Sequence, residues 1–98
     1  MSFDLSINED LYTITYNLSP MFYTCIPGAG IRAISGLRGS IALPILRAMR
    51  TYMEDHKDEM IAIEPANGWG SYAVALVFLG ELIAASIESP DEKWLVMA

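Results

Sequence analysis

The segment from Asn67 to Tyr72 has the residue types and spacing best suited to a binding site in this chain. It reads Asn-Gly-Trp-Gly-Ser-Tyr, so a large aromatic residue stands between two glycines just before the most apolar stretch of the sequence. Glycine lets the backbone take positive φ angles and lets other groups approach closely. A helix that begins here would also present unpaired N–H groups. The segment is therefore a candidate recognition loop.

Two interpretations of this loop stay open. In the structural one, Asn67 and Gly68 form a turn, Trp69 fills the core and Ser71 caps the helix. In the functional one, Trp69 and Tyr72 form an aromatic wall beside the first N–H groups of the helix. An arginine would then complete a pocket for a phosphate or a nucleotide. The candidate binding residues of this loop and its arginine are Asn67, Gly68, Trp69, Gly70, Ser71, Tyr72 and Arg47.

A second polar cluster precedes Leu18. It consists of Thr13, Thr15, Tyr16 and Asn17. On a helix, Thr13 and Asn17 are four residues apart and share a face, with Tyr16 next to it. These side chains have enough hydrogen-bonding capacity to line a pocket, but they are equally typical of an exposed helix face. Thr15, Tyr16 and Asn17 are therefore candidate binding residues as well.

The chain offers few residues with catalytic potential. The chain has a single histidine and a single cysteine, whereas a zinc site needs several such ligands. We interpret Cys25 as a buried structural thiol, and His56 as a solvated side chain at a helix end. The glycine pairs near Gly28 and Gly36 lack the Gly-Lys-Ser/Thr ending of a phosphate-binding loop. The sequence thus predicts no catalytic residue, no metal and no cofactor.

The composition describes one small acidic domain spanning residues 1–98. The net charge is −6, which makes nucleic acid a poor partner. Hydrophobic residues make up 53% and charged residues only 18%, so we expect either a well-filled core or an apolar surface covered in a homo-oligomer. One cysteine suggests a reducing compartment, the first residues lack a secretory pattern, and no apolar run is long enough to span a membrane.

Alternating apolar residues predict a strand at residues 3–7. Residues 9–25 fit a helix that Pro20 bends, although Tyr12, Ile14, Tyr16 and Leu18 also alternate as in a strand. We favour the helix. Residues 26–39 form a loop-rich passage.

A second helix is expected to begin after Ser40 as its N-cap, with Pro44 in its first turn. Its predicted apolar face holds Ile41, Ile45, Ala48, Met49 and Tyr52. Residues 55–60 form a short extra turn.

A third helix over residues 71–89 is apolar on nearly every side and is expected to be central, with Gly80 at a close helix crossing. Residues 93–97 form a last strand. The expected fold class is α+β and mostly helical, with about three helices packed on one face of a small sheet formed by the N- and C-terminal strands.

With both clusters in view, the chain resembles a family of small tailed-phage proteins of unassigned function. The resemblance rests on Ile14-Thr15-Tyr16-Asn17-Leu18 with Met21, on Leu46-Arg47-Ala48, and above all on the segment from Asn67 to Tyr72. Tyr16 departs from the histidine common at that place in the family. The resemblance implies a phage protein made in the bacterial cytoplasm and supports the helix over residues 9–25. It implies no known activity.

Our leading hypothesis is a non-enzymatic phage accessory protein that binds and inhibits a host or defence protein. A sponge that sequesters a nucleotide-like signalling molecule is the first alternative, and a minor virion or assembly component is the second. None of the three requires direct contact with nucleic acid or a membrane.

Overall fold

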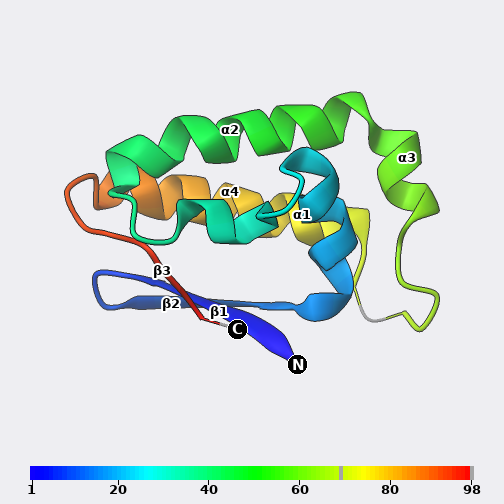
Figure 1. Ribbon diagram of the computed structural model, residues 1–98, viewed down its shortest axis with the longest axis horizontal. Helices are drawn as coiled ribbons and strands as arrows, with labels where there is room; N and C mark the ends of the chain where they lie inside the picture. Colours follow the sequence, from blue (N-terminus) through cyan, green and yellow to red (C-terminus); the bar gives the residue numbers. More distant parts are fainter. Residues whose placement is uncertain (69, 98) are drawn as a thin grey trace.

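The computed structural model describes residues 1–68 and 70–97 of the chain, and Figure 1 shows how its elements are arranged. The strands are β1 (Ser2–Ile7), β2 (Asp10–Thr15) and β3 (Leu95–Met97). The α-helices are α1 (Ser19–Cys25), α2 (Gly39–Asp55), α3 (Lys57–Ala62) and α4 (Tyr72–Glu88). Short 3₁₀ helices, η1 (Tyr16–Leu18) and η2 (Gly30–Ile34), lie before and after α1.

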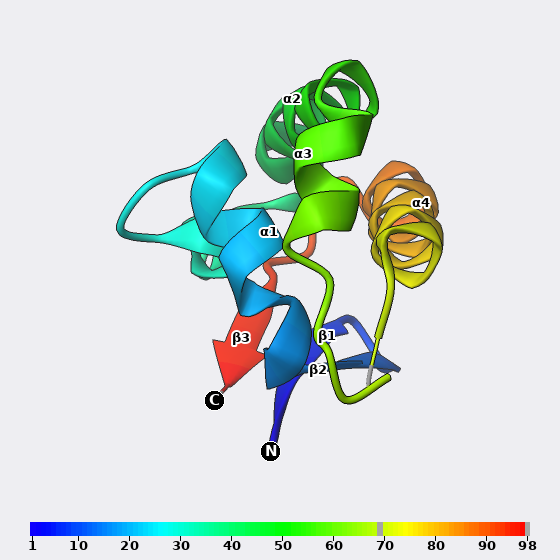
Figure 2. The ribbon, with the colours of Figure 1, turned by 90° about the vertical axis from the view of Figure 1, so that its right-hand side faces the viewer.

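The strands form an antiparallel sheet in the order β2-β1-β3. Leu5 in the central strand pairs with Tyr12 of β2 and with Val96 of β3. Phe3, Leu5 and Ile7 are buried and the residues between them are not, which is the period of a strand with one face on the core. Figures 1 and 2 show the helices together on that face. The expected α+β class and the pairing of the terminal strands are confirmed.

The predicted helix over residues 9–25 is wrong. Residues 10–15 form strand β2, and only Ser19–Cys25 is α-helical. Asn8 has a positive φ of 54°, which suits a two-residue hairpin turn between β1 and β2. Thr and Tyr favour strands, and Ile14 is buried while its neighbour Thr13 is exposed. Pro20 lies in the first turn of α1, where the missing N–H costs little, so it does not bend a longer helix.

Helix α2 starts earlier than predicted, and it buries a different set of side chains. Its N-cap is Arg38, not Ser40, so Pro44 lies inside the helix beyond the first turn. The backbone N–H of Ser40 donates to the Pro90 carbonyl at 3.0 Å. The buried residues of the helix are Gly39, Ala42, Leu46, Met49 and Met53. Of the predicted face only Met49 belongs to this set, and Ile41 is 55% exposed.

Helix α4 forms where predicted but is not central. Ser71 is its N-cap, and its side chain accepts a hydrogen bond from the Val74 N–H. One side packs on α2 and on the sheet, while Val77 on another side is 63% exposed. The expected short turn after α2 is the helix α3.

The close approach expected at Gly80 occurs instead at Gly39. A Cβ at Gly39 would lie 2.7 Å from the Ser86 carbonyl oxygen and would collide with that of Ser89 as well. A Cβ at Gly80 would meet only the Arg50 guanidinium, at 3.8 Å. Gly39 therefore allows the start of α2 to lie against the end of α4.

Trp94, just before β3, joins the two layers of the fold. Its side chain is 1% exposed, and its indole N–H donates to the Ser86 hydroxyl at 3.0 Å. That hydroxyl in turn donates to the Leu82 carbonyl of α4 at 2.8 Å. The Trp94 backbone N–H donates to Leu37, and the ring lies 5.9 Å from the ring of Tyr12 in β2. One residue thus contacts α4, β2 and the segment before α2.

We predict that Ser86→Ala lowers the free energy of unfolding by about 1–3 kcal/mol, because the buried indole N–H loses its acceptor. Trp94→Phe removes that donor, so the double variant should cost clearly less than the sum of the single ones. Urea denaturation of the four proteins measures this coupling. Additivity within about 0.5 kcal/mol would contradict a coupled pair.

Candidate functional site

An apolar groove lies between the edge strand β2 and helix α4. Its volume is about 310 Å³. The wall on the strand side is made by Thr13 and Ile14, and the wall on the helix side by Ala73, Val74, Val77, Phe78 and Glu81. The groove exists because α4 is apolar on more sides than α2 and the sheet can cover.

The rim of the groove is unusually apolar for an exposed surface. Val77 is 63% exposed and Val74 is 47% exposed. Large apolar side chains gathered on one face often mark an interaction site. Within the described parts of the chain, no element covers this face.

The groove has an acidic residue, Glu81, in its wall, and the elements that form it carry further carboxylates. Within β1, β2 and α4, the charged residues are Asp4, Asp10, Glu81 and Glu88, and none of these elements contains Lys or Arg. Burial raises the pKa of the half-buried Tyr12, and the carboxylates of Asp10, Glu88 and Glu81 raise it further. These three carboxylates therefore lie close enough to act on the Tyr12 hydroxyl.

The loop that sequence reasoning singled out has a structural role in its described part. Gly68 and Gly70 have φ angles of 75° and 117°. A Cβ at Gly70 would lie 2.9 Å from Cγ of Leu18, so the loop packs against the end of the segment from Ile14 to Leu18. Gly70 of this loop therefore lies against Leu18, the residue that follows the second cluster. Asn67 is exposed, and Trp69 lies outside the described residues.

The N-terminus of α4 already has internal partners. The Tyr72 N–H donates to the Glu64 carboxylate at 2.7 Å, and the Val74 N–H donates to the Ser71 hydroxyl at 3.1 Å. Tyr72 is 9% exposed. A carboxylate thus holds the place in which the functional interpretation put a bound anion.

The second polar cluster does not form a shared helix face, because Thr13 is in β2. Thr13 donates to the Asp4 carboxylate at 2.9 Å. The Thr15 hydroxyl accepts from the Asn17 backbone and side-chain amides and caps η1. The Tyr16 ring packs edge-on against Phe3, with ring centroids 4.5 Å apart. These contacts stabilise the corner between β2 and α1.

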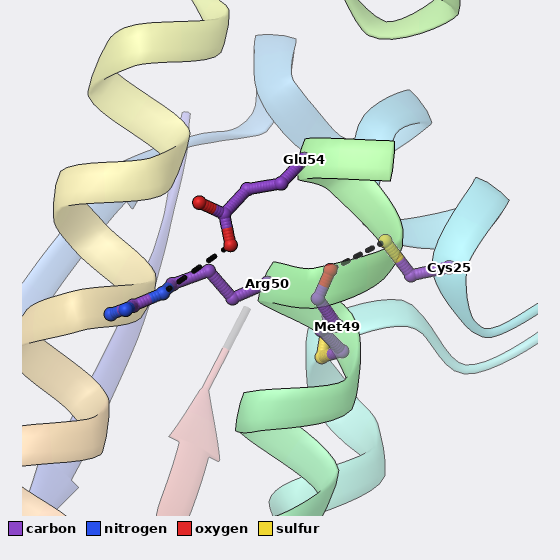
Figure 3. A network of polar contacts seen from close by, with 4 residues as sticks. All are labelled: Cys25, Met49, Arg50 and Glu54. Carbon is purple, nitrogen blue, oxygen red and sulfur yellow. Dashed lines mark hydrogen bonds and ion pairs between the residues drawn. The ribbon is translucent and has the colours of Figure 1, made fainter. Parts of the chain in front are cut away.

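Arg47 lies exposed on α2, beside a polar hollow of about 370 Å³ that it shares with Arg50, Thr51, Glu54 and Ile83. The Arg50 Nε lies 3.8 Å from a Glu54 oxygen, as Figure 3 shows. Burial, and next the charge of Glu54, raise the pKa of Tyr72. The Glu54 carboxylate therefore acts on both Arg50 and Tyr72.

Cys25 and His56 hold local structure. The Cys25 thiol is half-buried and lies 3.4 Å from the Met21 carbonyl and 3.7 Å from the Met49 carbonyl, the latter drawn in Figure 3. His56 ends α2 as predicted, but it is half-buried instead of solvated. Its ring stacks on Tyr52 with centroids 4.0 Å apart, and Nδ1 lies 2.8 Å from the Tyr52 carbonyl.

Across residues 1–68 and 70–97, no three His, Cys, Asp or Glu side chains gather as metal ligands would. No helix in the same ranges has the length and hydropathy of a membrane span. Comparisons with protein families, curated proteins and solved structures give no match to this chain.

The groove residues Val74, Val77 and Glu81 were not among the candidate site residues expected from the sequence. The signal was present in the all-round hydrophobicity of residues 72–88. A helix of that kind is either enclosed on all sides or left with apolar surface. A sheet this small cannot enclose it.

We predict that Ser71→Ala and Glu64→Ala each lower the free energy of unfolding by about 1 kcal/mol, because each removes an acceptor from the start of α4. The matched control is Ser40→Ala, at the N-cap that sequence reasoning wrongly assigned, and it should change stability by less than about 0.5 kcal/mol. Chemical denaturation provides the measurement. Equal effects at Ser40 and Ser71 would contradict the capping role.

We predict that the Cys25 thiol reacts slowly in the folded protein. Burial raises its pKa from 9.0 to about 11, so at pH 8 the thiolate should be about a hundredfold scarcer than for an ordinary thiol. Alkylation by iodoacetamide should be slower by about that factor than in the urea-unfolded protein, and its rate should rise with pH until about 11. Equal rates in the two states at pH 8 would contradict this.

Proposed function

We propose that this protein is a non-catalytic binding protein that acts by occupying another protein through the groove between β2 and α4. The observation that carries this proposal is the apolar wall formed by Val74 and Val77, which stays exposed beside an open sheet edge. Burying such side chains in a partner is favourable by about 25 cal/mol per Å² of apolar surface.

The resemblance to small tailed-phage proteins supports a more specific role. We propose that the partner is a host or defence protein in the cytoplasm of the bacterial host, and that binding inhibits it. A small domain can inhibit in this way without chemistry of its own, because covering a functional surface of the partner is enough.

The alternative, a sponge for a nucleotide-like signal, has less support. Such a ligand would need free donors at the start of α4 and a free arginine. Arg47 is exposed, but the Tyr72 and Val74 N–H groups already donate to Glu64 and Ser71. We therefore place the protein-binding role first.

The experiment compares capture from a bacterial host lysate by the wild-type protein, by the double variant Val74→Asn/Val77→Asn, and by Ile41→Asn. Ile41 is a matched control because it is also a large exposed aliphatic residue on a helix, at 55% exposure, but it lies on α2. Wild type and Ile41→Asn should retain one stoichiometric protein. The double variant should lose it at least about tenfold, since polar side chains at the contact forfeit the apolar burial.

All three proteins should have similar thermal stability, because these side chains are exposed. Recovery of no stoichiometric protein by wild type, or equal recovery by the double variant, would contradict the proposed role.

A further inference from the structure

We infer that the groove takes an extended, basic segment of the partner, which joins the sheet as an additional strand along β2. This inference rests on the proposed function and specifies the chemistry of the partner. Three features of the structure lead to it: the open edge of β2, the position of the groove along that edge, and the charge around it.

The hydrogen-bond pattern of the hairpin shows which backbone groups of β2 are available. In an antiparallel pair, successive residues direct their N–H and C=O groups alternately toward and away from the neighbouring strand. The Tyr16 N–H donates to the Met1 carbonyl, so residues 14, 12 and 10 face β1 as well. Leu11 and Thr13 therefore direct their backbone groups outward, and no backbone group within residues 1–68 and 70–97 bonds to them.

The groove opens onto this edge. Thr13 and Ile14 both line it, although consecutive residues of a strand point to opposite faces of the sheet. A hollow that touches both must run along the side of the strand. A segment bonded to Thr13 would consequently lie beside α4, with alternate side chains against Val77 and Phe78. This is the geometry of recognition by strand addition.

The charge around the groove selects among possible occupants. The hairpin and α4 carry Asp4, Glu9, Asp10, Glu81 and Glu88, and no Lys or Arg. A second copy of this chain, paired through the same edge, would bring the same carboxylates to the contact and would be repelled. An extended basic segment would instead bring cations close to these carboxylates, so charge complementarity favours a basic strand.

The probe is a capped octapeptide of alternating Lys and Val, titrated into the full-length protein at low salt by calorimetry. The test variant is Thr13→Pro, because proline removes the outward N–H and is tolerated on an edge strand whose N–H side faces solvent. Thr13→Val is its matched control, since it keeps the N–H and loses the same hydroxyl. Circular dichroism should show both variants folded.

Thr13→Val should bind the peptide as wild type does, and Thr13→Pro should bind about tenfold more weakly or not at all. Amide exchange at Leu11 and Thr13 should slow when the peptide is bound. Glu81→Gln/Glu88→Gln should weaken binding about threefold at low salt, and the Glu-Val counterpart of the peptide should not bind.

Several results would overturn the inference. Equal binding by Thr13→Pro and Thr13→Val would exclude strand addition, while the lysate capture through Val74 and Val77 could still succeed. Equal binding of the acidic peptide, or no binding of the basic one up to about 1 mM, would exclude a basic strand. A wild-type dimer in sedimentation equilibrium that Thr13→Pro converts to a monomer would make a second copy the occupant.

Discussion

The hydrogen bond from the Trp94 indole to the Ser86 hydroxyl links the two layers on which the fold depends. Strand β3 has three residues, too few to hold the C-terminal segment by its ladder alone. Trp94 buries its ring between α4 and Tyr12 of β2, and its backbone exchanges hydrogen bonds with Leu37 and Gly36. The C-terminal segment therefore contacts the sheet, α4 and the residues before α2. Gly39 lets the start of α2 lie close to the end of α4.

The sheet has only a few short strands, and it is therefore too small to cover all of the apolar surface of α4. With the order β2-β1-β3, β2 is an edge, and α4 extends its apolar surface past that edge. The apolar side chains from which α4 was predicted therefore fall into two groups, one in the core and one at the surface. Phe78, Leu79 and Leu82 stabilise the core, whereas Val74 and Val77 remain outside it. The sequence pattern predicts the helix, but only the packing shows which of its sides lacks a partner.

The failures of sequence reasoning have a common physical cause. Residues 10–15 suit helix or strand locally, and the choice depends on pairing with β1 through a turn at Asn8. Around α2, apolar residues occupy a broad arc, and the position of α4 decides that Ala42 and Leu46 are buried while Ile41 is not. Ser71 was predictable as a cap because capping is local. Glu64, which accepts from Tyr72, was not, because its position depends on the course of the chain after α3.

The charged residues are also segregated, first along the sequence and then among the elements of the fold. The run from Ile31 to Met53 contains arginines and no acid, and folding places most of it on α2, whereas the hairpin and α4 carry only acids. Arg50 pairs with Glu54 on α2 itself, and its guanidinium lies beside Gly80 of α4. A protein that self-associates through its apolar groove would gain from mixed charges around it. The carboxylates of the hairpin and α4 all carry the same sign, so two copies placed groove to groove would bring like charges together.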